Sequence, residues 1–131
     1  MGLSEERVPR DEYSAIDEVT HERAEQIVAR NDPYELSRLV ISVSLYDEDF
    51  DWAQSMCVRL ARHFDCTVLG NAVLSFGYLA RRFKRLDLEA IQPIYAAALV
   101  DSDQYVSSQA EDMLDEVRHH LRLSANWPLD T

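Results

Sequence analysis

Residues 70–80 constrain the fold more than any other part of the chain. This stretch, Gly-Asn-Ala-Val-Leu-Ser-Phe-Gly-Tyr-Leu-Ala, has no charged side chain, although 28% of all residues in the protein are charged. Such a stretch predicts a buried central helix. Gly70 and Gly77 are seven residues apart, so they share one face of that helix. Since each glycine costs about 1 kcal/mol relative to alanine inside a helix, the pair predicts that a neighbouring backbone lies close to that face.

The rest of the chain also shows helical periodicity. It has only three glycines and four prolines, and its apolar residues do not alternate as they do in strands. Helices are predicted over residues 12–29, 33–46 and 50–63, from Asp65 to about 83, from Asp87 through Leu99, and over 104–123. Residues 1–11 are predicted to be a flexible N-terminal segment and residues 12–131 a single domain. The tail around Trp127 and Pro128 is predicted to fold back over a helix end.

Aspartates mark most of the predicted helix starts, because a carboxylate can accept hydrogen bonds from the first free N–H groups of a helix. The predicted caps are Asp32, Asp65, Asp87 and either Asp101 or Asp103. Pro33 follows its cap at the first helical position, where a proline is tolerated. Pro93 is expected to bend its helix or to shift the helix start. Leu99 is expected to face inward, together with Ile91, Ile94, Tyr95 and Ala98.

The second half of the chain repeats itself at a shift of 38 residues. The shift pairs Asp65 with Asp103, Val68 with Val106, Ala72 with Ala110, Phe76 with Leu114, Leu79 with Val117 and Phe83 with Leu121. The repeating unit is a helix, a short turn ending in aspartate, and a second helix. Two-helix repeats of about 40 residues are typical of α-solenoids. The sequence therefore predicts an all-α fold, built as a short α-solenoid of antiparallel helical hairpins.

The charge of the protein restricts its partners. The net charge is −11, made up of −7 over residues 1–48, +3 over 49–86 and −7 over 87–131. A strongly acidic protein is a poor direct ligand for nucleic acid, which needs a basic surface. The basic cluster Arg81, Arg82, Lys84 and Arg85 is therefore assigned to the helix dipole, with a nucleic-acid patch as the alternative. The acidity favours fast association with a basic protein.

Composition also bears on location and redox state. No apolar run reaches the roughly 18 residues of a membrane-spanning helix, and the charged N-terminal stretch does not resemble a signal peptide. We expect a cytoplasmic protein that does not contact the membrane. Cys57 and Cys66 are the only cysteines and form no metal-binding or redox motif, so both are expected to be reduced.

The densest group of carboxylates is Asp47, Glu48, Asp49 and Asp51. A calcium loop that began at Asp47 would need glycine at its sixth position and glutamate at its twelfth, but these positions are Trp52 and Val58. The group is therefore either a solvated loop with acids at a helix N-terminus or an edge that binds a partner. A metal site is the third and least favoured interpretation.

Other chemistry is not indicated. The four histidines are scattered, and the sequence contains no HExxH, no serine elbow and no phosphate-binding glycine loop. We therefore expect no catalysis, no metal and no cofactor. Glu111, Asp112, Asp115 and Glu116 lie on the outward face of the last predicted helix, where they are either solvated or matched to a basic partner.

Several runs of residues resemble a known group of proteins. Asp65-x-x-Val68-Leu69-Gly70-Asn71-Ala72 and Asp103-x-x-Val106 resemble the HEAT repeat. Ser44-Leu45-Tyr46-Asp47, Trp52-Ala53-Gln54, residues 70–82 and Asp103-Gln104-Tyr105-Val106 resemble small bacterial HEAT-like proteins, several of which are identified as immunity proteins of contact-dependent inhibition or other polymorphic toxin systems. The resemblance covers about residues 32–123. Leu69 and Ser107 depart from it, because the HEAT pattern commonly has arginine there, paired with a ladder of aspartates.

The resemblance implies a protein that binds a cognate toxin domain, one with a basic surface such as a nuclease, and neutralises it by steric and electrostatic occlusion. The alternatives are a general HEAT-like adaptor and, less favoured, a helical subunit that binds a small ligand or accompanies an enzyme. The predicted contact residues are Asp47, Glu48, Asp49, Asp51, Tyr78, Glu111, Asp112 and Asp115. Tyr78 would be an aromatic anchor between the two acidic groups. We expect a monomer or a weak homodimer.

Overall fold

The computed structural model describes residues 17–122, and these residues form six α-helices and no strand. The helices are α1 (His21–Arg30), α2 (Pro33–Tyr46), α3 (Phe50–Leu60), α4 (Cys66–Phe83), α5 (Leu88–Leu99) and α6 (Gln104–Leu121). The prediction of an all-α fold is confirmed. The tail around Trp127 and Pro128 and the predicted helix residues 12–16 lie outside the described part.

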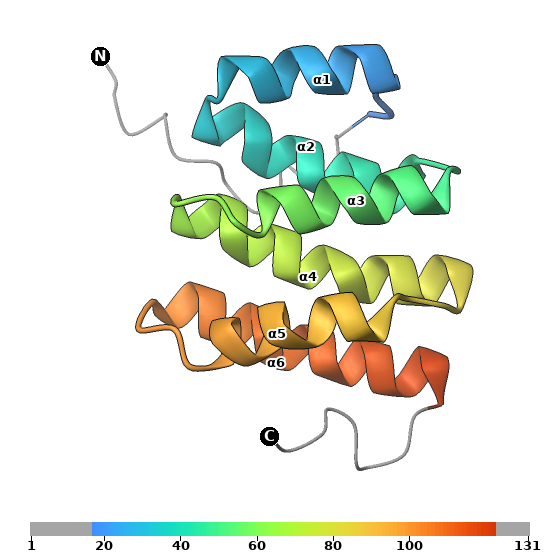
Figure 1. Ribbon diagram of the computed structural model, residues 1–131, viewed down its shortest axis with the longest axis vertical. Helices are drawn as coiled ribbons and strands as arrows, with labels where there is room; N and C mark the ends of the chain where they lie inside the picture. Colours follow the sequence, from blue (N-terminus) through green and yellow to red (C-terminus); the bar gives the residue numbers. More distant parts are fainter. Residues whose placement is uncertain (1–16, 123–131) are drawn as a thin grey trace.

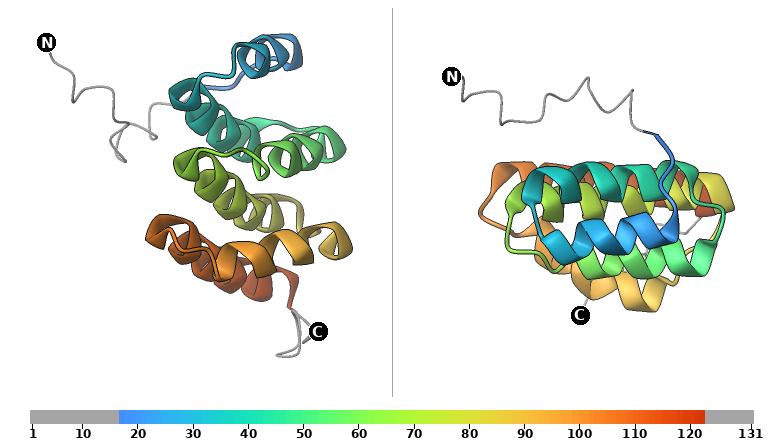
Figure 2. Two further views of the ribbon diagram at one scale, coloured as in Figure 1. Left: turned by 60° about the vertical axis from the view of Figure 1, so that its left-hand side comes forward. Right: turned by 90° about the horizontal axis from the view of Figure 1, so that it is seen from above.

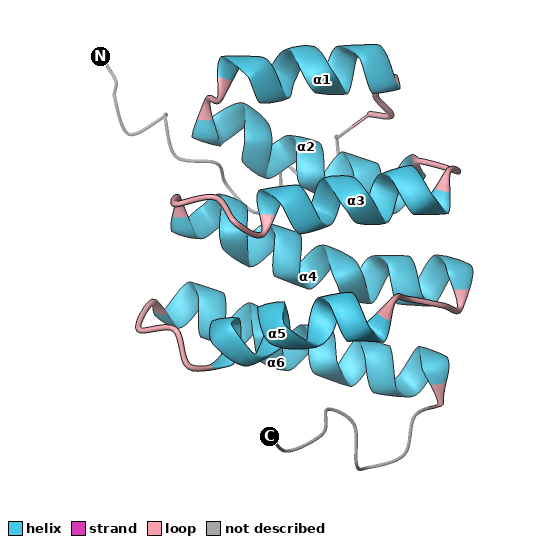
Figure 3. Cartoon of the chain, viewed as in Figure 1, coloured by secondary structure: helices cyan, strands magenta, loops and turns pink. Residues whose placement is uncertain are grey.

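The helices form three antiparallel hairpins stacked one on the next (Figure 1). The even-numbered helices make up one layer and the odd-numbered helices the other, which is clearest when the stack is seen from above (Figure 2). Helix α4 lies at the centre and packs most extensively against α6 and α2. The prediction of a short helical solenoid around the stretch 70–80 is therefore confirmed, and Figure 3 shows how short the connecting loops are.

Every helix starts at a side chain that accepts a hydrogen bond from the first turn. These N-caps are Thr20, Asp32, Asp49, Asp65, Asp87 and Asp103. A cap of this kind stabilises a helix by about 1 kcal/mol. The caps decide two open points: Asp103, not Asp101, caps α6, and Pro93 neither shifts the start of α5 nor ends it.

The first predicted helix begins later than expected. Residues 17–20 are not helical, and Thr20 accepts a hydrogen bond from the Arg23 N–H at 3.1 Å. The prediction of a helix over 12–29 is wrong for residues 17–20, because the apolar periodicity runs past this cap: Val19 packs against the core from outside the helix.

The caps of α4 and α6 correspond at the 38-residue shift. Lys84 ends α4 and Arg122 ends α6, both in the left-handed conformation with φ of 58° and 55°. Asp65 and Asp103 each accept hydrogen bonds from the N–H groups two and three residues later. Within residues 17–122 neither aspartate forms an ion pair with an arginine, in keeping with the absence of the HEAT-type arginine.

Both glycines of α4 lie against α6. A Cβ atom added to Gly77 would be 2.9 Å from the Cβ of Glu116, and one added to Gly70 would be 2.7 Å from the ring of Tyr105. Real Cβ atoms do not approach neighbours so closely, so each glycine permits a contact that alanine would obstruct. The predicted close approach of a neighbouring backbone is confirmed at Gly77, where the Cα of Met113 in α6 would be 3.6 Å from the added atom, whereas at Gly70 the close atoms belong to side chains of α6.

A buried asparagine links the three helices of the even layer. Asn71 is fully buried, donates through Nδ2 to the carbonyl of Ser37 in α2 at 3.1 Å, and accepts from the hydroxyl of Tyr105 in α6. Ser75, one turn later, donates to the carbonyl of Val40 at 3.3 Å. Satisfied polar groups inside an apolar core favour one packing register over others, so Asn71 helps to set how the hairpins stack.

The outer side of α6 is polar where the equivalent side of α4 is buried. Val73 and Gly77 of α4 are buried, whereas the repeat places Glu111 and Asp115 at the equivalent positions of α6, and both are exposed. A solenoid needs such a polar face on its terminal repeat. Leu99, which was expected to face inward, is 37% exposed, whereas the equivalent Ala61 is 7% exposed. That prediction is wrong because no further described hairpin stacks beyond α5 and α6.

Candidate functional site

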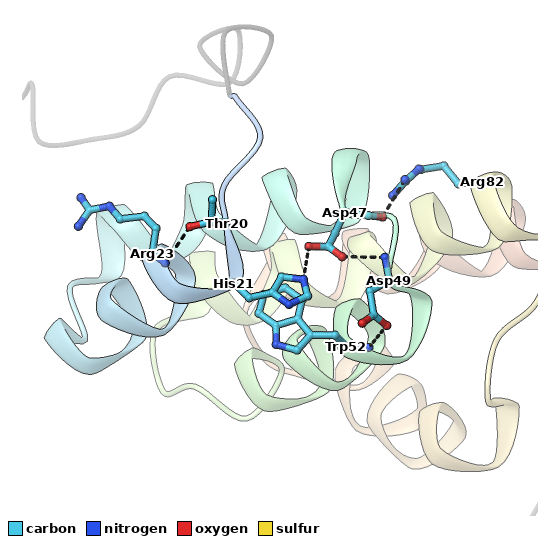
Figure 4. Close-up of polar contacts among 7 residues, drawn as sticks. All are labelled: Thr20, His21, Arg23, Asp47, Asp49, Trp52 and Arg82. Carbon is cyan, nitrogen blue, oxygen red and sulfur yellow. Dashed lines mark hydrogen bonds and ion pairs between the residues drawn. The ribbon is translucent and has the colours of Figure 1, made fainter.

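The turn between α2 and α3 holds the first acidic group, but its first member points into the protein (Figure 4). The Asp47 side chain is 8% exposed and accepts a hydrogen bond from His21 Nε2 at 2.8 Å. Its other carboxylate oxygen accepts from the Asp49 N–H at 2.8 Å. Asp47 therefore holds the turn and the start of α1 together, and little of its carboxylate is accessible to a partner.

His21 is oriented by a second contact. Its ring stacks on the Trp52 ring with centroids 3.7 Å apart and an angle of 8° between the planes. Thr20 caps α1 directly before His21, so the helix start carries the imidazole to Asp47 and Trp52 (Figure 4). These contacts fasten the first hairpin to the second, which gives His21 and Trp52 a role in packing rather than in chemistry.

Arg82 ties α4 to the end of α2. Its guanidinium donates to the carbonyl of Ser44 and to the carbonyl of Asp47, both at 2.8 Å. A cation at a helix C-terminus is favourable because it meets the free carbonyls and the negative end of the dipole. We expected the basic cluster to serve the end of its own helix, but Arg82 serves the neighbouring one. The sequence showed no sign of this contact beyond the presence of a cation.

The remaining acids of the turn are exposed. Glu48 and Asp51 point to solvent, and Asp49 caps α3 by accepting from the Trp52 N–H at 3.1 Å. Acidic side chains in the first turn of a helix also interact favourably with the helix dipole. Their assignment as contact residues for a partner stays a prediction.

The second acidic group lies along α6. Glu111, Asp112 and Asp115 are all exposed. Burial raises the pKa of Tyr95 in α5; Arg118 opposes the shift, and the Glu111 and Asp115 carboxylates add to it. These two acids of α6 therefore lie close enough to α5 to act on its tyrosine.

Tyr78 is half-buried on α4, with the Arg81 guanidinium 5.1 Å from its ring centroid. Helix α4 separates α2 from α6, so Tyr78 belongs to the helix between the two acidic groups, as predicted from the repeat. The structure does not bring the acidic groups together into one cluster: one lies at the C-terminal end of α2 and the other along α6. Whether Tyr78 contacts a partner stays a prediction.

Residues 17–122 contain no group of three or more histidine, cysteine, aspartate or glutamate side chains placed to hold a metal ion. None of the helices in this part of the chain is both long and apolar enough to cross a membrane.

The two cysteines are free thiols in different surroundings. Cys57 is completely buried, and burial raises its pKa. Cys66 is the first residue of α4 and is half-buried. Its hydrogen bond to Asp103, with smaller effects of burial and of the Asp101 and Asp65 carboxylates, raises its pKa. Negative charge near a thiol disfavours the thiolate, which is the reactive form.

We expect the variant Asp103→Asn to speed alkylation of Cys66 by iodoacetamide at pH 8. Asparagine caps a helix as well as aspartate, so the fold is retained, while loss of the charge lowers the raised pKa and increases the thiolate fraction. Mass spectrometry of the native protein gives the rate at each cysteine. Cys57 should remain unmodified in both proteins and is the internal control. An unchanged or slower rate at Cys66 would contradict the assigned effect of Asp103.

No protein-family model and no curated protein sequence matches the chain. Among solved structures, the fold is similar to a chain of the crystal structure of a CDI complex from Cupriavidus taiwanensis LMG 19424, with a TM-score of 0.67 and 25% sequence identity. The match covers 79% of this chain and 91% of that chain. The likeness thus spans nearly the whole of the other chain, not a single hairpin.

Proposed function

We propose that this chain is an immunity protein that binds a cognate toxin domain and neutralises it by covering its working surface. The observation that carries the proposal is the similarity to a chain of a CDI complex over 91% of that chain, at 25% identity. A chain from a complex has a surface that another protein occupies, and the shared fold would offer the same kind of surface here.

The charge of the described residues supports a basic partner. Residues 17–122 contain 19 acidic and 11 basic side chains, a net charge of −8. Complementary charge raises the rate of encounter and disfavours wrong partners. A toxin domain that acts on nucleic acid needs a basic surface, so an acidic inhibitor would both find it quickly and occlude it.

The proposed contact residues are the exposed acids of both groups, with Tyr78 as an aromatic anchor. The acids are Glu48, Asp49 and Asp51 in and after the α2–α3 turn, and Glu111, Asp112 and Asp115 on α6. Asp47 would act indirectly, since its hydrogen bonds to His21 and to the Asp49 N–H hold the turn. In such an interface the rim charges set mainly the association rate, and buried anchors set mainly the dissociation rate.

One observation favours a second candidate, the binding of a small ligand. A hollow of about 290 Å³ opens between α1 and α2 and is lined by residues that include Ile27, Tyr34, Arg38 and Ser42. Ligand sites usually have volumes of about 300–1,000 Å³, so this hollow is at the lower end of the range. The third candidate function is that of a general adaptor, which no separate observation supports.

The proposal is tested with the toxin domain encoded directly upstream of this chain's gene, where an immunity system would place it. We expect co-expression of this chain to restore the growth of cells that produce the toxin domain. We also expect the purified proteins to form a one-to-one complex whose association rate falls as salt is added. A catalytically inactive toxin domain allows surface plasmon resonance at two ionic strengths. Absence of both binding and protection would refute the immunity function and leave the adaptor and small-ligand readings.

A further inference from the structure

The outer face of α5 is apolar although it is exposed. Only Ile91, Tyr95 and Ala98 of this helix are buried. The exposed apolar residues, here called the α5 apolar face, are Ala90, Pro93, Ala96, Ala97, Leu99 and the C-cap Val100. Val100 is 80% exposed, and Glu89 is the only charged residue in the helix. An exposed surface of this kind, when rimmed by polar groups, is a mark of interaction sites.

The repeat shows that the fold does not require an apolar residue at three of the six positions of this face. Helix α3 is the equivalent helix of the preceding hairpin, and the 38-residue shift pairs Pro93, Ala97 and Val100 with Ser55, Arg59 and Arg62. All three residues, Ser55 and Arg59 of α3 and Arg62 just after that helix, are exposed and polar. Two positions that carry arginine in and just after α3 thus carry alanine and valine in α5 and at its C-cap. Pro93 also lies inside its helix, where proline removes a backbone hydrogen bond.

One of those arginines forms an ion pair with a neighbouring helix, and the alanine at the equivalent position of α5 cannot form one. Arg59 Nη1 forms an ion pair with Glu25 of α1 at 3.0 Å, across the outer layer. Ala97, which takes its place in α5, has no charge with which to link to α3. The outer layer is therefore joined by polar contacts between α1 and α3, whereas α5 presents methyl groups to solvent.

The hairpin that carries the α5 apolar face is acidic. Residues 87–122 hold eight acidic and two basic side chains, a net charge of −6, whereas the equivalent residues 49–84 hold three acidic and five basic side chains, a net charge of +2. Glu89 lies at the start of α5 and Asp101 follows its end. Glu111 and Asp115 are exposed on α6, the helix that packs against α5. The two equivalent hairpins thus have charges of opposite sign, and only the last one combines acids with an exposed apolar face.

We propose that the α5 apolar face, together with Glu111 and Asp115 of α6, is the surface on which the basic toxin domain docks. This inference rests on the proposed function and narrows its contact surface to the last hairpin, with the α5 apolar face as the anchor in place of Tyr78 and without the acids of the α2–α3 turn. An apolar centre inside a charged rim is the usual arrangement of specific interfaces. The same charges disfavour a second copy as the occupant, because a two-fold interface would set this acidic rim against itself.

The proposal is tested with neutral substitutions that leave the net charge unchanged. Ala97→Gln with Val100→Gln removes apolar surface from α5 at exposed positions that suit glutamine. The control is Ala29→Gln on α1 with Ser55→Gln on α3, which are exposed positions of the same layer. Surface plasmon resonance against the inactive upstream toxin domain should show about tenfold or more weaker binding for the α5 variant, mainly through faster dissociation. The control should bind within about twofold of the unmodified chain.

A charge variant and a mapping experiment complete the test. Glu111→Lys with Asp115→Lys should slow association and flatten its salt dependence. Hydrogen exchange of the unmodified complex should show the strongest new protection in α5 and α6. Binding by the unmodified chain with unchanged rates for both variants, or protection confined to α1 and α2, would overturn this inference and leave the immunity function standing. A native dimer that the α5 variant dissociates would also overturn it, with a second copy as the occupant. No binding by the unmodified chain would refute both proposals.

Discussion

Replacing Phe76 by alanine is expected to lower the free energy of unfolding by about 3–5 kcal/mol, the usual range for a phenylalanine removed from a core. Phe76 is fully buried in the central helix α4 and is the largest of the completely buried side chains. Its removal would leave a cavity that rigid helices on both sides fill only in part. Urea denaturation followed by circular dichroism measures the loss.

The repeat supplies a matched control for this prediction. Leu114 occupies the position equivalent to Phe76 in α6, but it is only half-buried because no described helix covers it. Leu114→Ala should therefore destabilise the protein by less than the roughly 2–5 kcal/mol typical of a fully buried leucine. Equal losses for the two variants would show that α4 is not the centre of the core.

Gly77→Leu is expected to destabilise the protein by about 1–3 kcal/mol, as overpacking of a core usually does. Helix propensity alone predicts the opposite, a gain approaching 1 kcal/mol for replacing glycine in a helix. The contact with α6 decides between them: even a Cβ atom at Gly77 would be 2.9 Å from the Cβ of Glu116, with the backbone of Met113 close behind at 3.6 Å. Neither of these atoms is at the mobile end of a side chain, so α6 itself must shift.

Thermal and urea unfolding of Gly77→Leu should be compared with those of Ser55→Ala. Ser55 is exposed on α3, where no neighbour restricts the side chain, so alanine should stabilise the protein by a few tenths of a kcal/mol through propensity. Opposite signs for the two variants are the expected result. A higher melting temperature for Gly77→Leu would mean that the helices do not approach as closely as the structure shows.

Local signals predicted most of the fold because they act within a few residues. Asp32, Asp65 and Asp87 were predicted as helix starts, and each accepts a hydrogen bond from an N–H two or three residues later. The start of α1 was missed because Thr20 is a weaker signal than aspartate and apolar residues continue on both sides of it. Pro93 was expected to disturb α5, but its packing against α6 and α4 carries the helix through.

The candidate surface was less predictable, because burial depends on residues far away in the chain. Four carboxylates between residues 47 and 51 look alike in sequence. Asp47 differs from the others only because His21, 26 residues earlier, and Arg82, 35 residues later, come to its side chain and carbonyl. Leu99 of the α5 apolar face was predicted to belong to the core for a similar reason. Apolar residues predict burial, and nothing in the sequence distinguishes Leu99 from a leucine that another helix buries.

What the sequence by itself determined is therefore the set of helices and their repetition. Caps and periodicity depend on residues that are close in sequence, and the 38-residue shift repeats these local patterns. None of them depends on what packs against each hairpin. Only the tertiary structure decided which faces are covered. Val73 and Gly77 are buried because α6 stacks on them, while Glu111, Asp115 and Leu99 are exposed because no described hairpin stacks on α5 and α6. Asn71 likewise links three helices only because the stacking of α2 and α6 on α4 brings Ser37 and Tyr105 to its side chain. These two residues lie 34 positions before and 34 positions after Asn71 in the sequence.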